Sequence, residues 1–344
     1  MITWAWYTAI LLVVGTTAAG RACAAAPLWP RRITAAALAF SLLLLGIVAA
    51  RLWSQTNDAF GGDGALTMEH AQVILFETPW GGGWMWQAGA SLCTFLAVVA
   101  WRWRWAAWPI AALCASAMAF ATALTGHAVG MEEQAWITIL AHGLHVIAAG
   151  WWIGALAMIL LVTSGSDFER DVQARVSLAQ VVTRFSPIAI MAVSLLVAAG
   201  LVATWRHVIV QAGVGGFASP YGLALAAKVA AFAGAALCGL YNWRVLTPSI
   251  ESSPDATRQF RIVAWLEVSL GVVALVLTAL LGTLSMPEPG DGQPEHTRTS
   301  ALRFYQDLQP LKIGGQRGLQ GTTHHELRHK PETMQFPGVV NLDF

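Results

Sequence analysis

Two histidines lie three residues apart inside a long apolar segment. The segment runs from Gln134 to Ser164, and His142 and His145 fall about a third to halfway through it. Side chains three residues apart on an α-helix share a face, so both imidazoles can point into one cavity. An ionisable side chain at membrane depth is costly and marks a functional site by default, and imidazole is the commonest protein ligand for metals. The pair therefore predicts a metal or redox site.

Further candidate ligands precede this segment. His127 and Met131 come just before it, and Met68 and His70 lie in the stretch 54–83. Imidazole suits Cu(II) and thioether suits Cu(I), so a set of histidines and methionines favours copper. The alternative is that each histidine only hydrogen-bonds to a neighbouring helix. Two histidines in one helix with a third nearby favour the ligand role.

The last part of the chain, 287–344, is polar and rich in proline and glycine, which predicts little regular structure. It contains a short tract of His324, His325 and His329, and such tracts can bind metal. We therefore expect an external tail that either binds metal or docks a partner.

The composition is that of a membrane protein. Of 344 residues, 56% are hydrophobic and only 11% are charged, which excludes an ordinary soluble domain. The four cysteines are scattered singly with no C-x-x-C pair, so no thiolate metal clamp is indicated. The chain has no phosphate-binding loop, no basic patch and no hydrolase motif, so we expect no nucleotide, no nucleic acid and no enzymatic activity.

Segments of about 20 apolar residues predict an all-α fold, an eight-helix transmembrane bundle. We expect an N-terminal four-helix half over 1–125 with a long external loop at 54–83, a second four-helix half over 126–286, and the tail. The predicted spans are 3–20, 33–53, 84–101, 105–126, 135–163, 185–206, 221–243 and 262–284.

Arginines indicate the orientation of these spans. Alternate loops hold most of them, and the opposite loops hold only Arg51 and Arg206, both expected at helix ends. By the positive-inside rule the arginine-rich loops are cytoplasmic, so both termini lie outside. The arginines of the cytoplasmic loops are Arg21, Arg31, Arg32, Arg102, Arg104, Arg170, Arg175, Arg184, Arg244, Arg258 and Arg261.

Two further charged residues fall well inside spans, Lys228 and Glu267. An uncompensated buried carboxylate is expensive, so we expect Glu267 to form a structural ion pair near the inner helix ends, where Asn242, Arg244 and Arg184 lie. Lys228, in the outer half, either extends its amine to the membrane surface, opposes cations or holds an anion.

An ordered set of motifs over 126–284 resembles the bacterial copper resistance protein D family. The motifs are G-H-A at 126–128, L-H-V-I-A-A-G-W-W-I-G-A-L at 144–156, R-F-S at 184–186, A-A-G-L-V-A-T at 198–204, S-P-Y-G-L-A-L-A-A-K at 219–228, Y-N-W-R at 241–244 and W-L-E-V-S-L-G at 265–271. The first four spans resemble the family only in topology.

The resemblance implies an eight-helix protein that moves copper, as Cu(I) or Cu(II), across the bacterial inner membrane, often beside a periplasmic copper-binding partner. It places His127 and His145 on family histidines, and Lys228, Asn242 and Glu267 on family polar positions. His142 and the histidines of the tail are additions to the family pattern. Two alternatives stay open: a membrane redox protein that binds haem b between histidines, and an accessory subunit of a larger membrane complex.

Overall fold

The computed structural model describes residues 2–23, 30–61, 66–125, 135–164, 171–205 and 218–284. Within these ranges the chain is helical and contains no β-strand, as an all-α fold requires. In chain order the helical elements are α1 (Ile2–Cys23), α2 (Pro30–Phe60), α3 (Met68–Glu77), α4 (Pro79–Trp103), η1 (Trp105–Ala107), α5 (Trp108–Ala121), η2 (Thr122–Thr125), α6 (Ala135–Ala149), η4 (Gly150–Gly154), α7 (Ala155–Val162), α9 (Val172–Thr204), α11 (Pro220–Tyr241), η7 (Asn242–Leu246), η8 (Thr247–Ser249) and α12 (Pro254–Leu281).

Three of the long helices begin with the same N-terminal capping motif. A threonine or serine caps the helix and a proline follows at the first helical position, where its missing N–H is no loss. The cap hydroxyls of Thr78, Ser219 and Ser253 accept hydrogen bonds from backbone N–H groups at 3.1, 3.0 and 3.2 Å. These pairs set the first residues of α4, α11 and α12.

Several helix bounds differ from the predicted ones. Most of 54–83, predicted as a loop, is helical: α2 continues to Phe60, α3 follows, and α4 begins at Pro79. The helix predicted at 185–206 begins at Val172, and the one predicted at 262–284 begins at Pro254. Hydropathy alone missed these turns because their residues are polar, although their caps and spacing are helical.

Within the described residues, six helical segments are long and apolar enough to cross a membrane. They are Arg31–Phe60, Trp80–Trp103, Trp136–Val162, Val172–Thr204, Pro220–Ser249 and Pro254–Leu281. Helix α1 and the 14-residue α5 do not belong to this set, so eight spans stay a prediction. The chain is a multi-pass membrane protein.

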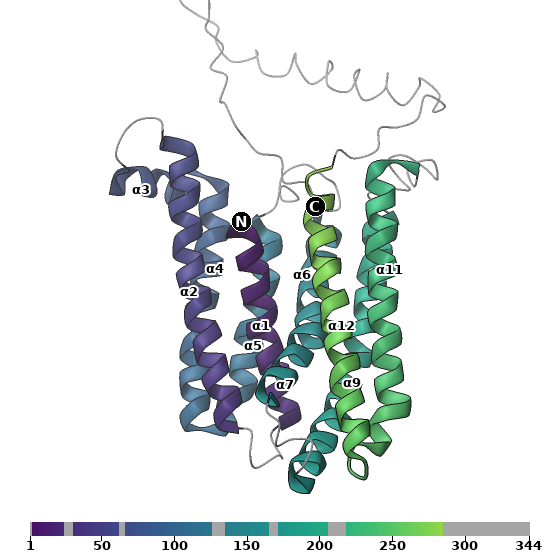
Figure 1. The fold of residues 1–344 in the computed structure, drawn as a ribbon. Helices are drawn as coiled ribbons and strands as arrows, with labels where there is room; N and C mark the ends of the chain where they lie inside the picture. The colour runs from purple at the N-terminus through teal and green to yellow at the C-terminus, as the bar shows by residue number, and fades with distance from the viewer. Residues whose placement is uncertain are drawn as a thin grey trace, which may run out of the picture.

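Helix α1 joins the two halves of the bundle. It packs against α2 and α5 of the first half and against η4, α7 and α9 of the second (Figure 1). Gly15 of α1 meets Gly154 at the end of η4, and a Cβ on Gly15 would lie 2.6 Å from the Gly154 Cα. The absence of side chains at this crossing lets the two backbones touch.

The start of α1 and the end of α12 lie at the same end of the bundle (Figure 1). That end also carries α3 and the first turn of α6. The side of the membrane that this end faces is taken from the arginine distribution and stays a prediction.

Candidate functional site

The predicted histidine pair lies on α6, on a face that also carries a threonine. Thr138, His142 and His145 are spaced i, i+4 and i+7, which places them along one side of the helix. Both imidazoles are half-buried, and the Thr138 hydroxyl is buried without a hydrogen-bond partner. Sequence reasoning missed Thr138, although its spacing from the two histidines was readable.

Helices from both halves of the chain reach this face. The Tyr7 ring of α1 meets the His142 ring edge-on, with centroids 6.5 Å apart and planes at 82°. The Lys228 ammonium of α11 is close enough to interact electrostatically with both imidazoles, and the two imidazoles interact with each other. The face of α6 that carries the two histidines is thus approached by a phenol ring from α1 and by a cation from α11.

Met68 and His70 lie elsewhere. They open α3, which packs against α2 and α4 at the edge of the bundle, whereas α6 packs against α1, α5 and α9 (Figure 1). Met68 is 76% exposed, and the His70 ring stacks on Phe60 with centroids 4.6 Å apart. The predicted outer ligands are thus separate from the histidine pair.

His70 already has a local role at the start of α3. Its backbone N–H donates to the Thr67 hydroxyl, and its Nδ1 accepts a hydrogen bond from the Thr67 backbone N–H, both at 3.3 Å. A neutral imidazole whose Nδ1 accepts carries its proton on Nε2, so neither nitrogen has a lone pair free for a metal in this arrangement. The capping box argues against His70 as a copper ligand.

The other predicted metal ligands lie outside the described residues. These are His127 and Met131, which precede α6, and the tail residues His324, His325 and His329. Within the described part of the chain, no three side chains from histidine, cysteine, aspartate and glutamate come together as a metal site. Among the described residues, the pair on α6 therefore offers a metal two imidazoles and no third ligand of these four kinds.

A second cation, Arg51, lies on α2, nine residues before the end of that helix. Arg51 was expected at a helix end, but α2 continues nine residues further to Phe60. Its Nη1 donates to Gln87 Oε1 at 2.5 Å, and its guanidinium lies 4.7 Å from the centroid of the Trp6 ring. Gln87 is itself fully buried and donates to the Ala121 carbonyl at 3.2 Å. This network ties α2 to α1, α4 and α5, which is a structural role.

Glu267 is buried, but not as the predicted ion pair. It lies halfway along α12 rather than near an inner helix end, and only 3% of it is exposed. Trp152 Nε1 donates to its Oε1 at 2.6 Å, and Asn242 Nδ2 donates to its Oε2 at 3.3 Å. The predicted contact with Asn242 is present, and Trp152 is a partner that the sequence did not indicate.

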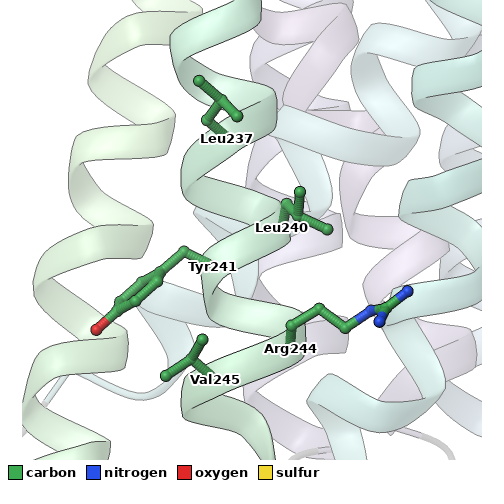
Figure 2. A pocket seen from close by; sticks show the side chains of 5 residues that line it. All are labelled: Leu237, Leu240, Tyr241, Arg244 and Val245. Carbon is green, nitrogen blue, oxygen red and sulfur yellow. The ribbon is translucent and has the colours of Figure 1, made fainter.

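Arg244 does not pair with Glu267, so the predicted ion pair is wrong. The π-helical turn η7 carries Arg244 to the outer surface of the bundle, where its guanidinium lies 4.4 Å from the centroid of the Trp243 ring. Arg244 lies at an open groove of about 470 Å³, and Figure 2 shows the side chains that line it. The groove is lined by Leu237, Leu240, Tyr241, Arg244 and Val245.

Comparisons with known proteins decide the family. The model of the copper resistance protein D-like N-terminal domain matches residues 1–135, and the copper resistance protein D model matches residues 179–281. The chain belongs to the copper resistance protein D family. The first match also covers the N-terminal region, where the sequence motifs gave only a resemblance in topology.

A curated relative points the same way. Copper transport protein CutJ of Bacillus subtilis (strain 168) is 26% identical over 265 residues, which is 76% of this chain and 46% of CutJ. The chain thus spans about half the length of the relative it matches. No solved structure matches the chain significantly. These names associate the family with copper, and none of them supports the haem alternative.

Proposed function

We propose that this copper resistance D protein binds copper ions from outside the bacterial inner membrane and moves or delivers them through the membrane without an enzymatic step. One observation above all supports it: in a chain of this family, two imidazoles one helical turn apart lie on one face of α6, within electrostatic range of Lys228. Neutral imidazole binds both oxidation states of copper. In this proposal the bundle has eight spans and both termini lie outside.

The copper site consists of His142 and His145 with a third ligand from the segment that precedes α6, His127 or Met131. Two nitrogens alone leave copper with open positions, and a thioether or a third imidazole there would complete the site. Met68 and the tail histidines are capture sites at the outer end. His70 is not a ligand in this proposal, because its Nδ1 accepts a hydrogen bond from the Thr67 backbone N–H.

Lys228 sets how tightly the site holds its cargo. Its ammonium interacts electrostatically with both imidazoles, so a bound cation is repelled as well as ligated. Conduction requires binding that is favourable enough to enter and weak enough to leave. Lys228 therefore favours exchange over storage. The protein passes copper on, to the inner side or to an acceptor such as a copper-binding partner.

Copper binding to purified, lipid-reconstituted protein tests the proposal. We would measure bound copper under reducing and oxidising conditions for the wild type, for His142→Ala/His145→Ala and for His70→Ala as a matched control. The wild type and the control should bind one tight copper ion, which the double variant loses. Equal amounts of bound copper in the double variant and the wild type would rule out a copper site at His142 and His145. A haem Soret band stoichiometric with protein would favour the haem-binding alternative over copper.

Uptake into proteoliposomes separates transport from delivery. Each of the three proteins is reconstituted into liposomes that contain a copper-sensitive dye. Copper should enter the vesicles that carry the wild type or the control, and not those that carry the double variant. Tight binding without entry would assign the protein to copper delivery.

A further inference from the structure

The buried carboxylate of Glu267 has only neutral partners. It lies at the middle of α12, and its two hydrogen-bond donors are the indole of Trp152 and the amide of Asn242. A carboxylate at this depth is usually paired with a cation or left protonated, because an isolated charge there is expensive. Glu267 has no cationic partner among the described residues, so its protonation state is free to change.

None of the other titratable groups packed against α12 supplies a cation that pairs with Glu267 among the described residues. Helix α11 carries the Cys238 thiol, which interacts electrostatically with Glu267, and η7 carries Arg244, which lies over Trp243 instead. Lys228 is also on α11, but ten residues before Cys238, about 15 Å along the helix. The remaining elements packed on α12, η4, α7 and η8, contain no titratable residue.

Asn242 supplies the second observation. It is 4% exposed, and its Oδ1 is buried without any hydrogen-bond partner, while its Nδ2 donates to Glu267. A buried acceptor without a donor is rare in folded proteins and calls for an explanation. A donor that comes and goes would explain it, and a protonated Glu267 is such a donor, since a carboxylic acid carries one O–H.

The Glu267 carboxyl packs directly against the backbone of α11. Gly239, one turn before Asn242, has no side chain, and a Cβ there would lie 2.9 Å from Glu267 Oε1. Both donors belong to π-helical turns, Trp152 to η4 and Asn242 to η7. Single π-helical turns within α-helices are frequently found at functional sites.

We propose that Glu267 and Asn242 form a proton-binding site inside the membrane bundle. On uptake, one proton from water adds to Oε2 of the carboxylate, and the Asn242 amide turns over about its last side-chain torsion. The new O–H then donates to Oδ1, in place of the N–H that donated to Oε2. Trp152 keeps its bond to Oε1 in both states. On release the proton returns to water and the amide turns back.

Infrared difference spectroscopy of the full chain in lipid tests this directly. Spectra recorded at acidic and alkaline pH should differ by the C=O stretch of one protonated carboxylic acid in an apolar site. Glu267→Gln should abolish that band. Glu251→Gln, which changes an exposed carboxylate in the turn before α12, should keep it. Asn242→Leu should keep the band, shift its frequency and move the pH at which it appears.

If Glu267→Gln does not fold, Asn242→Leu still tests the proposal, because it leaves the carboxyl group of Glu267 in place. A band that survives Glu267→Gln, or that is identical in Asn242→Leu and the wild type, would overturn the proposal. So would a carboxylate signal that responds to added sodium ions and not to pH. None of these readouts involves copper, so the result is independent of the copper site.

Discussion

Replacing Gly154 by alanine is expected to destabilise the protein by pushing α1 away from the helix that carries the histidines. A Cβ on Gly154 would lie 2.9 Å from the carbonyl carbon of Leu11 and 3.2 Å from the Cα of Gly15, and closer still to the Leu11 oxygen. Carbon atoms in contact prefer about 3.5–4.0 Å, so one backbone must retreat by roughly half an ångström or more. Both partners are main chain, so no side-chain rotation relieves the clash.

The expected size follows from two opposing effects. Overpacking of a dense core costs about 1–3 kcal/mol, and the upper end applies here because backbone must move. Alanine in place of glycine in a helix gains roughly 1 kcal/mol. The net loss is about 2 kcal/mol, which lowers the unfolding midpoint by roughly 3 °C for a chain of this size.

Gly46→Ala is the matched control. Gly46 lies within α2, and a Cβ there would meet nothing within 4 Å, so only the helix-propensity gain remains. The two variants should therefore shift the midpoint in opposite directions, measured by thermal unfolding of purified protein in one detergent. Gly15→Ala/Gly154→Ala should lose less than the sum of its single variants, because both act at one contact. A Gly154→Ala protein as stable as Gly46→Ala would refute the close crossing.

Three other outcomes follow from the site. Lys228→Met should strengthen copper binding by about tenfold, because it removes a positive charge worth roughly 1–2 kcal/mol at this range. Arg258→Met, which changes an exposed residue near the start of α12, should leave copper binding unchanged, and competition with a copper chelator measures both variants. Trp152→Phe should lower the free energy of unfolding by about 1.5–3 kcal/mol, since it removes the donor to Glu267 Oε1 and leaves the carboxyl buried; denaturant titration checks it, and an unchanged midpoint would contradict the 2.6 Å bond. Thr78→Ala should cost about 1 kcal/mol through loss of the α4 cap, and Thr78→Ser should restore most of it in the same assay.

Much of the fold was readable from local patterns. Hydropathy located the long helices, and the two histidines were correctly placed together on one helix face because i, i+3 spacing is a property of the helix alone. The helix starts were less accurate, yet the pairs Thr78–Pro79, Ser219–Pro220 and Ser253–Pro254 state them in the sequence. Capping residues deserve the same weight as apolar runs in such proteins.

The failures concern contacts between helices. The pairing of Glu267 with Trp152 depends on a π-helical turn that rotates the indole inward, and no periodicity in the sequence announces that turn. Arg244 was expected at the same depth as Glu267, but η7 turns it to the surface, so equal depth did not mean contact. Arg51 was misplaced because the polar residues after it hid the last turns of α2.

The segment that carries the histidines, Trp136–Val162, is enclosed by other helices. In its most apolar stretch 67% of the residues are buried, against 17% in α11 with its extension and in α12. Acyl chains therefore touch mainly the peripheral helices, while most residues around the half-buried imidazoles are enclosed by protein. Detergent extraction and changes of bilayer thickness should destabilise the packing of the peripheral helices first. In a protein purified without its native lipids, His142 and His145 should keep their positions relative to the surrounding helices.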